Sequence, residues 1–307
     1  MSTKKEKGFF EEFSSVYDLI DTVKIRPMNE TYAGLAKAMP DYFPSSEKKQ
    51  RKKFCSESLE QAYELALNGD KKAYNKQLKY EAENISLVSK NSKEDDNFDT
   101  RFDFRGGAPV VPLALMGVPR CFRRNELKQK DVTAVRLYID ISVAWFIDES
   151  VVIKAGLAVE AAVKGLIKSG VNVEIYICDF FTSKCRESCK DRYGFALKVK
   201  SFSEPLNAYR LSYFFQNVSY LRRIGFKWIE TIPVTPVTEA AEVYYKVDNN
   251  VAYWKDKVDK THHNDSAKNI VVMMQEYACE ARNKNQSDIN DYVREDVINN
   301  INKTLKV

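Results

Sequence analysis

Two apolar runs on either side of one long helical pattern constrain the fold of this 307-residue chain more than any other feature. Residues 135–141 and 171–178 have the composition of buried strands, and residues 150–168 repeat apolar side chains at helical spacing. The polar exceptions on that helix form one narrow stripe: Glu160, Lys164 and Lys168. A strand, a buried helix and a second strand within about 45 residues predict a right-handed βαβ unit. The expected class is therefore α/β, with a mostly parallel sheet and helices on both faces.

The rest of the C-terminal half fits the same pattern. Candidate strands cover residues 195–202, 226–232 and 269–274, and the first of them could form a hairpin with the strand before it. One candidate helix begins at Ser203, and two others cover residues 238–245 and 288–305. We therefore expect one α/β domain over residues 132–307.

The first 98 residues are predicted to be a helical region. Apolar side chains recur at helical spacing between Phe9 and Ile20, and further helical patterns cover residues 59–67 and 71–88. Residues 99–131 differ, because their glycines and prolines disfavour regular structure while Val110–Met116 is too apolar for a solvated linker. We expect this connector to pack across a domain surface.

Charge and hydropathy exclude several classes of protein. Lys and Arg number 48 against 43 Asp and Glu, so the net charge of +5 is nearly balanced. Arg120, Arg123 and Arg124 form a local basic cluster, which predicts either a nucleic-acid contact or a solvated linker. No run of about 18 apolar residues is present, and the charged N-terminus is unlike a signal peptide. A cytoplasmic protein with no membrane partner is expected.

Oxygen-bearing side chains gather where the predicted strands end. They are Asp140, Ser142, Asp148, Asp179, Ser201, Ser203 and Glu230. Ligands of open α/β sheets bind outside the carboxyl ends of the strands, and such oxygens suit magnesium or calcium. Helix capping explains an acid such as Asp148 equally well.

The first of these strand ends resembles a known motif. Tyr138–Ala144, followed by a helix and a strand, is similar to the opening of von Willebrand factor A-type domains, whose metal-ion-dependent adhesion site begins with Asp-x-Ser-x-Ser. Asp140 and Ser142 match its first two positions, whereas Ala144 stands where the family has serine. The resemblance covers roughly residues 132–275. It implies that Ser203, or Ser201, replaces the family's threonine and Glu230 its later aspartate, around Mg²⁺ or Ca²⁺.

The resemblance implies adhesion, in which a partner's carboxylate fills an open position on the metal. A protein–protein interaction module with a degenerate metal site is therefore expected. The order of the parts is also similar to uncharacterised proteins of tailed phages and some bacteria, which implies the host cytoplasm or the virion.

Two alternatives stay open. Asp140, Asp179 and Glu230 could cluster around magnesium for phosphodiester hydrolysis, as in nucleases with a PIN-like core. The chain could instead be a structural component of a phage assembly, with some of its 17 Tyr and 17 Phe as interface anchors.

Overall fold

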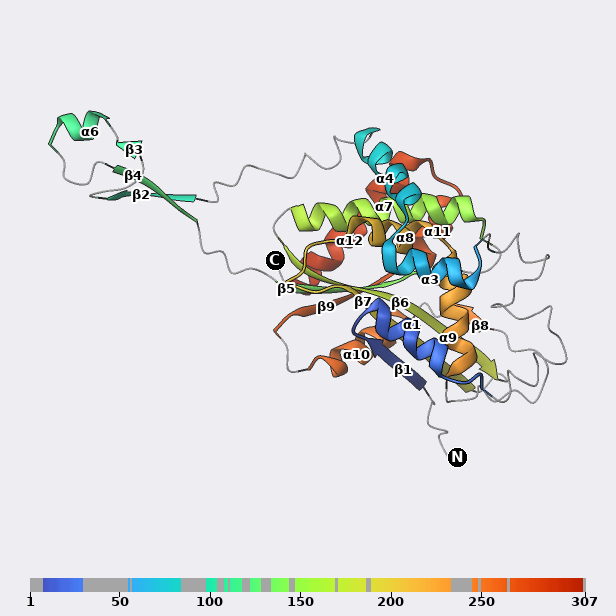
Figure 1. Ribbon diagram of the computed structural model, residues 1–307. Helices are drawn as coiled ribbons and strands as arrows, with labels where there is room; N and C mark the ends of the chain where they lie inside the picture. Colours follow the sequence, from blue (N-terminus) through green and yellow to red (C-terminus); the bar gives the residue numbers. More distant parts are fainter. Residues whose placement is uncertain are drawn as a thin grey trace. The chain divides into compact units, whose positions relative to one another are not determined.

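The computed structural model describes the following residues: 8–29, 55, 57–83, 98–103, 108–109, 111–117, 122–127, 134–143, 147–168, 171–185, 189–232, 245–247, 250–263 and 266–305. The chain divides into two compact units (Figure 1). Unit 1 comprises Met1–Asn84 and Ala134–Val307, and unit 2 is the insertion Ile85–Thr133. The N-terminal segment therefore belongs to the α/β unit instead of forming a region of its own.

Unit 1 is built on a mixed sheet with the strand order β1-β7-β6-β5-β9, and β8 pairs with β6 outside this path. Its strands are β1 (Gly8–Phe13), β5 (Ala134–Asp140), β6 (Asn172–Cys185), β7 (Cys189–Lys200), β8 (Tyr245–Val247) and β9 (Lys268–Met273). β5 is parallel to both β6 and β9, and β1 is parallel to β7. β6 is antiparallel to β7 and β8. The α/β class and the mostly parallel sheet are confirmed, as are the parallel strands of the predicted βαβ unit.

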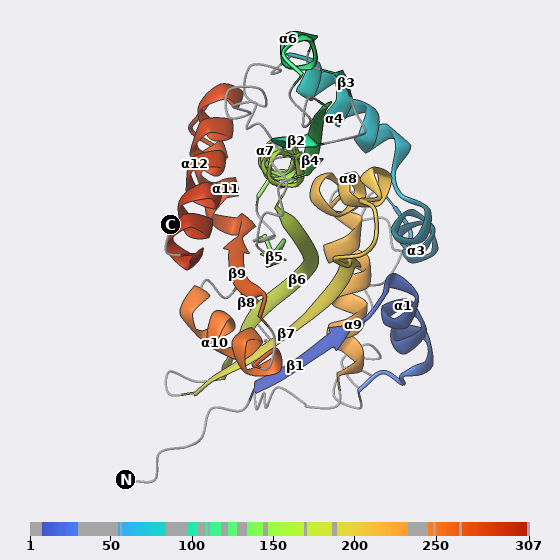
Figure 2. The same cartoon turned by 90° about the vertical axis from the view of Figure 1, so that its left-hand side faces the viewer.

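Helices cover both faces of this sheet (Figure 2). The described helices of unit 1 are α1 (Val16–Ile25), α3 (Leu59–Asn68), α4 (Lys71–Glu83), α7 (Glu149–Lys168), α8 (Ala208–Gln216), α9 (Phe226–Thr231), α10 (Val251–Thr261), α11 (Met274–Ala281) and α12 (Gln286–Leu305). Successive side chains of a strand point to opposite faces. Leu137 and Ile139 of β5 therefore enter the larger core with α7, α8 and α11, whereas Tyr138 enters the smaller core with Trp254 of α10.

The first strand corrects the expected N-terminal helix. Phe9 and Phe13 lie in β1, which pairs with β7, and α1 begins only at Val16. Ser15 caps α1, and its hydroxyl accepts a hydrogen bond from the backbone N–H of Asp18 at 3.2 Å. A short apolar run is compatible with both the strand period and the helix period. Residues 8–13 form a strand because the edge of β7 is available for pairing.

Residues 226–231 are also helical, contrary to the predicted strand. A π-helical segment, η3 (Tyr220–Gly225), leads directly into α9. Trp228 is fully buried, and its indole N–H donates to Oε2 of Glu11 at 2.9 Å. This tertiary contact on β1 could not be inferred from local periodicity.

Other predicted boundaries shift. α8 begins at Ala208, with the Asn207 side chain as its N-cap, and not at Ser203. The helix predicted over 238–245 falls on residues outside the described ones, apart from Tyr245, which begins β8. The strand β9 and the final helix α12 lie where they were predicted. Of the described helices, none combines the length and apolar character needed to cross a bilayer.

Unit 2 contains a small antiparallel sheet where an irregular connector was predicted. β2 (Phe98–Asp103) pairs with β4 (Phe122–Leu127), and β4 pairs with β3 (Ala108–Pro109). A one-turn helix, α6 (Val111–Leu115), follows β3 in the chain. Gly117 has a φ of 70°, which favours glycine, directly after this turn. Pro109 lies within β3 and Pro112 within α6, so proline does not prevent short elements here.

Candidate functional site: two buried acids at the sheet edge

The carboxyl end of β5 lies at a topological switch point. From β5 the chain crosses through α7 to β6 on one side, and it later returns to β9 on the other side. Asp140 is the last residue of β5, opposite Cys178 of β6 and Met273 of β9. Leaving β1 and β8 aside, the order β7-β6-β5-β9 is third, second, first and fourth along the chain, and such sheets bind ligands at this point.

Asp140 is held by the turn that follows it. Its Oδ1 accepts hydrogen bonds from the backbone N–H groups of Ser142 and Phe180, both at 3.1 Å. The Ser142 hydroxyl lies 2.6 Å from the same oxygen. Asp140 is fully buried and Ser142 is 3% exposed, so these contacts form away from solvent. The Asp-x-Ser spacing thus makes a compact turn at the end of the strand.

A second acid reaches the same hydroxyl. Oδ1 of Asp179, from β6, lies 2.6 Å from Oγ of Ser142, which also accepts from the Phe180 N–H at 2.9 Å. One hydroxyl carries one hydrogen and can donate to only one of the two carboxylates. The outer oxygens, Oδ2 of Asp140 and Oδ2 of Asp179, are buried and accept no hydrogen bond from any described residue. These two outer oxygens can therefore still bind a proton or a cation.

Burial raises the pKa of both carboxyls. Desolvation is the main cause for Asp140, whose pKa lies well above its ordinary value and is raised further by the charge of Asp179. Desolvation also raises the pKa of Asp179 to about 6, while the hydrogen bond from Ser142 lowers it. Two ionised carboxylates sharing such a site repel one another, so neutralising one of them is favourable.

The π-helical segment η3 borders Asp179. A Cβ on Gly225 would lie 2.8 Å from Oδ2 of Asp179, so glycine allows this close approach. Tyr220, also in η3, is fully buried, and its hydroxyl has no hydrogen-bond partner among the described residues. The Asp179 charge contributes to its raised pKa. Three buried oxygens without partners thus belong to one neighbourhood. Single π-turns are frequent at functional sites.

A hollow lies beside the acids at the same edge. Ile141 and Val143, on either side of Ser142, line it together with Val218 and Arg222. Arg222 is 5% exposed, and it donates to the backbone oxygen of Ile147 at 3.3 Å. Desolvation lowers the pKa of this guanidinium. This end of the sheet therefore carries a buried acid pair and, beside it, an apolar hollow that Arg222 also lines.

Comparison with known families covers nearly the whole chain. The family model described as "Domain of unknown function (DUF7192)" matches residues 2–300. The chain is a member of the DUF7192 family. Comparisons with curated proteins and with solved structures give no match.

The DUF7192 chain brings together only part of the predicted metal site. Asp140 and Ser142 are in contact as expected. Ser203, however, follows β7, which is antiparallel to β6 and ends beside the amino end of β6. Nζ of Lys200 donates to the Val173 backbone oxygen at 2.7 Å, beside the start of β6. Asp179 lies six residues further along β6, roughly 20 Å away at strand rise. The antiparallel direction of β7 thus separates Ser203 from the acids, and Ser201 with it.

Glu230 is also placed elsewhere, because residues 226–231 form a helix. It is buried in α9 beside Lys227, at 3.5 Å, and its backbone oxygen accepts from Asn29. Among the described residues, no three His, Cys, Asp or Glu side chains come close enough to hold a metal. Asp140, Asp179 and Glu230, all described, therefore do not form the acid cluster that a nuclease was expected to use. Ala144 lies outside the described residues.

The predicted nucleic-acid residues lie in unit 2. Arg123 and Arg124 are consecutive residues of β4, and Arg120 falls outside the described residues. A nucleic-acid contact there stays a prediction. Sequence reasoning placed Asp179 at a strand end and used it for the nuclease, but it missed the contact with Ser142. The signal was the position of Asp179 one residue beyond Cys178, which is paired with Asp140.

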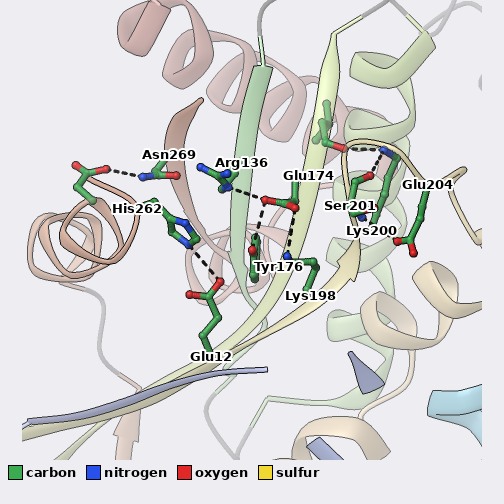
Figure 3. Close-up of polar contacts among 12 residues, drawn as sticks. Glu12, Arg136, Glu174, Tyr176, Lys198, Lys200, Ser201, Glu204, His262 and Asn269 are labelled. Atoms are coloured by element: carbon green, nitrogen blue, oxygen red, sulfur yellow. Dashed lines mark hydrogen bonds and ion pairs between the residues drawn. The ribbon is translucent and has the colours of Figure 1, made fainter. Parts of the chain in front are cut away.

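A second polar cluster lies on the sheet face that carries α10 (Figure 3). Nε of Arg136 contacts Glu174 at 2.6 Å, and Lys198 lies 3.5 Å from the same carboxylate. The Tyr138 and Tyr176 rings stack with centroids 4.6 Å apart, and His262 contacts Glu12 at 3.2 Å. In this cluster the acids face cations or a histidine, so it shows the pairing that the acids at the sheet edge lack.

Proposed function

We propose that this chain is a binding module of the von Willebrand A type, in which Asp140, Ser142 and Asp179 hold a divalent cation at the carboxyl edge of the sheet. One observation carries the proposal: two buried carboxylates share one hydroxyl, and within the described part of the chain the outer oxygen of each accepts no hydrogen bond. An unneutralised buried charge is costly, and carboxylate and hydroxyl oxygens suit Mg²⁺ or Ca²⁺.

The strand order and the Asp-x-Ser turn support the same proposal. The site uses Asp179 in place of the residues first expected, Ser203 and Glu230. Burial of the acids gives the cation a structural part: it would neutralise the pair and fix the turn after β5. A protein partner would then dock over the adjoining hollow, where Arg222 and apolar side chains lie. When bound, the cation supplies the positive charge that neutralises the two carboxylates.

The test is thermal unfolding at pH 7.5 with EDTA, Mg²⁺, Ca²⁺ or Mn²⁺. The wild-type chain should unfold at a higher temperature with a divalent cation, since a ligand of the folded state stabilises it. Asp140→Asn and Asp179→Asn should abolish this response. Asp148→Asn is the matched control, because Asp148 is an exposed acid eight residues along the chain, and it should respond like wild type. Equal unfolding temperatures with EDTA and with every cation would overturn the proposal.

A further inference from the structure

The helix α6 of unit 2 exposes an apolar surface. Val111 is 60% exposed, Leu115 is 83% exposed and Met116 is 76% exposed. Within residues 111–117 only Leu113 is partly covered. Isolated exposed aliphatic residues are ordinary, but a contiguous set on one turn marks an interaction surface. We name residues 111–117 the apolar tip.

The composition of the apolar tip favours a non-directional partner. Residues 111–117 read VPLALMG and contain neither an aromatic ring nor a side chain that forms hydrogen bonds. Energetic centres of protein interfaces are rich in Trp, Tyr and Arg and poor in Leu and Val. The backbone of the turn is partly satisfied internally, since Met116 N–H donates to Pro112 and Gly117 N–H to Ala114, both at 3.1 Å. Such a segment suits a hydrocarbon environment.

Positive charge follows the apolar tip in the sequence. Residues 120–130 contain Arg120, Arg123, Arg124, Lys128 and Lys130 against the single acid Glu126, whereas the two arginines of residues 98–107 are balanced by two aspartates. Basic residues next to an apolar segment are attracted to the anionic headgroups of a bilayer, and the apolar residues enter the acyl boundary. The charge of this segment is thus complementary to an anionic lipid surface.

We propose that the apolar tip of unit 2 docks this protein on the surface of an anionic lipid bilayer. Val111, Leu115 and Met116 enter the interface, and the arginines and lysines of residues 120–130 contact the headgroups. This contact is peripheral and needs no spanning helix. It differs from the sequence expectation that the connector packs across a domain surface and that no membrane partner exists, and it is independent of the acid pair in unit 1.

The experiment is co-sedimentation of the full chain with phosphatidylcholine vesicles that contain, or lack, phosphatidylserine, at low salt. Wild type should bind the anionic vesicles at least tenfold more tightly than the neutral ones. Leu115→Glu combined with Met116→Glu should lose at least tenfold in this affinity. Arg123→Gln combined with Arg124→Gln should reduce the difference between the two vesicle types.

The matched control is Ile25→Glu, because Ile25 on α1 is 82% exposed and lies outside the apolar tip. It should bind as wild type does, and circular dichroism should show all variants folded. Wild type that stays in solution, as expected if the tip docks a protein or a second copy, would overturn the proposal. Equal binding of the Leu115/Met116 variant, or equal binding to neutral vesicles, would overturn it as well.

Discussion

Two buried acids of unit 1 have the same exposure and opposite surroundings. Glu160 on α7 and Asp140 at the end of β5 are both fully buried. Glu160 accepts from Ser212 at 2.7 Å and from Gln216 at 2.8 Å, and it pairs with Lys164 at 2.8 Å. Asp140 has no cation among its partners in the described part of the chain, and it shares the Ser142 hydroxyl with a second acid. The difference separates an acid that holds helices together from one whose buried charge has no counter-charge among the described residues.

The surroundings explain the pKa of each acid. Desolvation raises the pKa of Glu160, and the charge of Lys164 and three hydrogen bonds offset part of this rise. For Asp140 the neighbouring charge is that of Asp179 and raises the pKa further. Lys164 also contacts Glu81 of α4 at 2.9 Å, so the Glu160 cluster connects the N-terminal helix α4 to α7. The cluster thus gives a structural reason why α4 belongs to unit 1.

Removing the cation from the Glu160 cluster should have the largest effect. Lys164→Met leaves Glu160 buried without its counter-charge and should lower the unfolding free energy by about 3–5 kcal/mol. Urea denaturation at pH 7 measures this loss, and it should be the same with EDTA and with Mg²⁺. A loss below about 1 kcal/mol would mean that the hydrogen bonds from Ser212 and Gln216 suffice.

The acid pair at the sheet edge should make stability fall as pH rises in the absence of divalent cations. The pKa of Asp179 is about 6 in the folded chain and near 3.8 when unperturbed, so the folded state holds more protons between these values. Its contribution is lost as pH rises through that window, by on the order of 2–3 kcal/mol. The measurement is the difference in unfolding free energy between wild type and Asp179→Asn at pH 4 to 8 in EDTA. A difference that does not change with pH would contradict the assignment.

Neutral substitution should have opposite signs at the two acids. Asp140→Asn removes repulsion from Asp179 and should raise the unfolding free energy by about 1–2 kcal/mol at pH 8 without divalent cations. Glu160→Gln leaves Lys164 facing an amide and should lower it by a similar amount. Thermal and urea unfolding of both variants compare the signs directly. Destabilisation by both would show that the edge acids are as fully paired as Glu160.

A methyl group beside Asp179 should have the smallest effect. Gly225→Ala places Cβ against Oδ2 of Asp179, at 2.8 Å before relaxation, and should cost about 1 kcal/mol. It should also weaken the response to divalent cations, because the displaced oxygen is one of the two without partners. Gly165→Ala is the control, since a Cβ at Gly165 meets no atom within 4 Å. An unchanged cation response of Gly225→Ala would remove Asp179 Oδ2 from the site.

The sequence allowed a good prediction of the centre of the fold, where local and tertiary preferences agree. The continuous apolar runs of β5, β6 and β9 and the long apolar helix α7 fit only a covered, mostly parallel sheet. Prediction failed where a short apolar run fits two periods. Phe9–Phe13 became a strand because β7 offers an edge, and Phe226–Thr231 became a helix that buries Trp228 against Glu11. Both outcomes depend on partners more than 180 residues away along the chain.

The candidate site was predictable only in its first half. Asp140 and Ser142 are two residues apart, so a single turn brings them together. Their partner depends on strand direction: the hairpin of β6 and β7 carries Ser203 to the opposite edge, whereas the parallel register of β5 and β6 places Asp179 beside Ser142. The direction of each strand outside the βαβ unit depends on the whole fold, so a local stretch of sequence does not predict it.

The most direct measurement of the central claim is a crystal structure of the full chain grown with Mn²⁺, with anomalous data. We predict one anomalous peak within about 2.6 Å of carboxylate oxygens of both Asp140 and Asp179. A crystal that contains Mn²⁺ but shows no peak there, with the two carboxylates still sharing the Ser142 hydroxyl, would contradict the account and assign the pair to a shared proton.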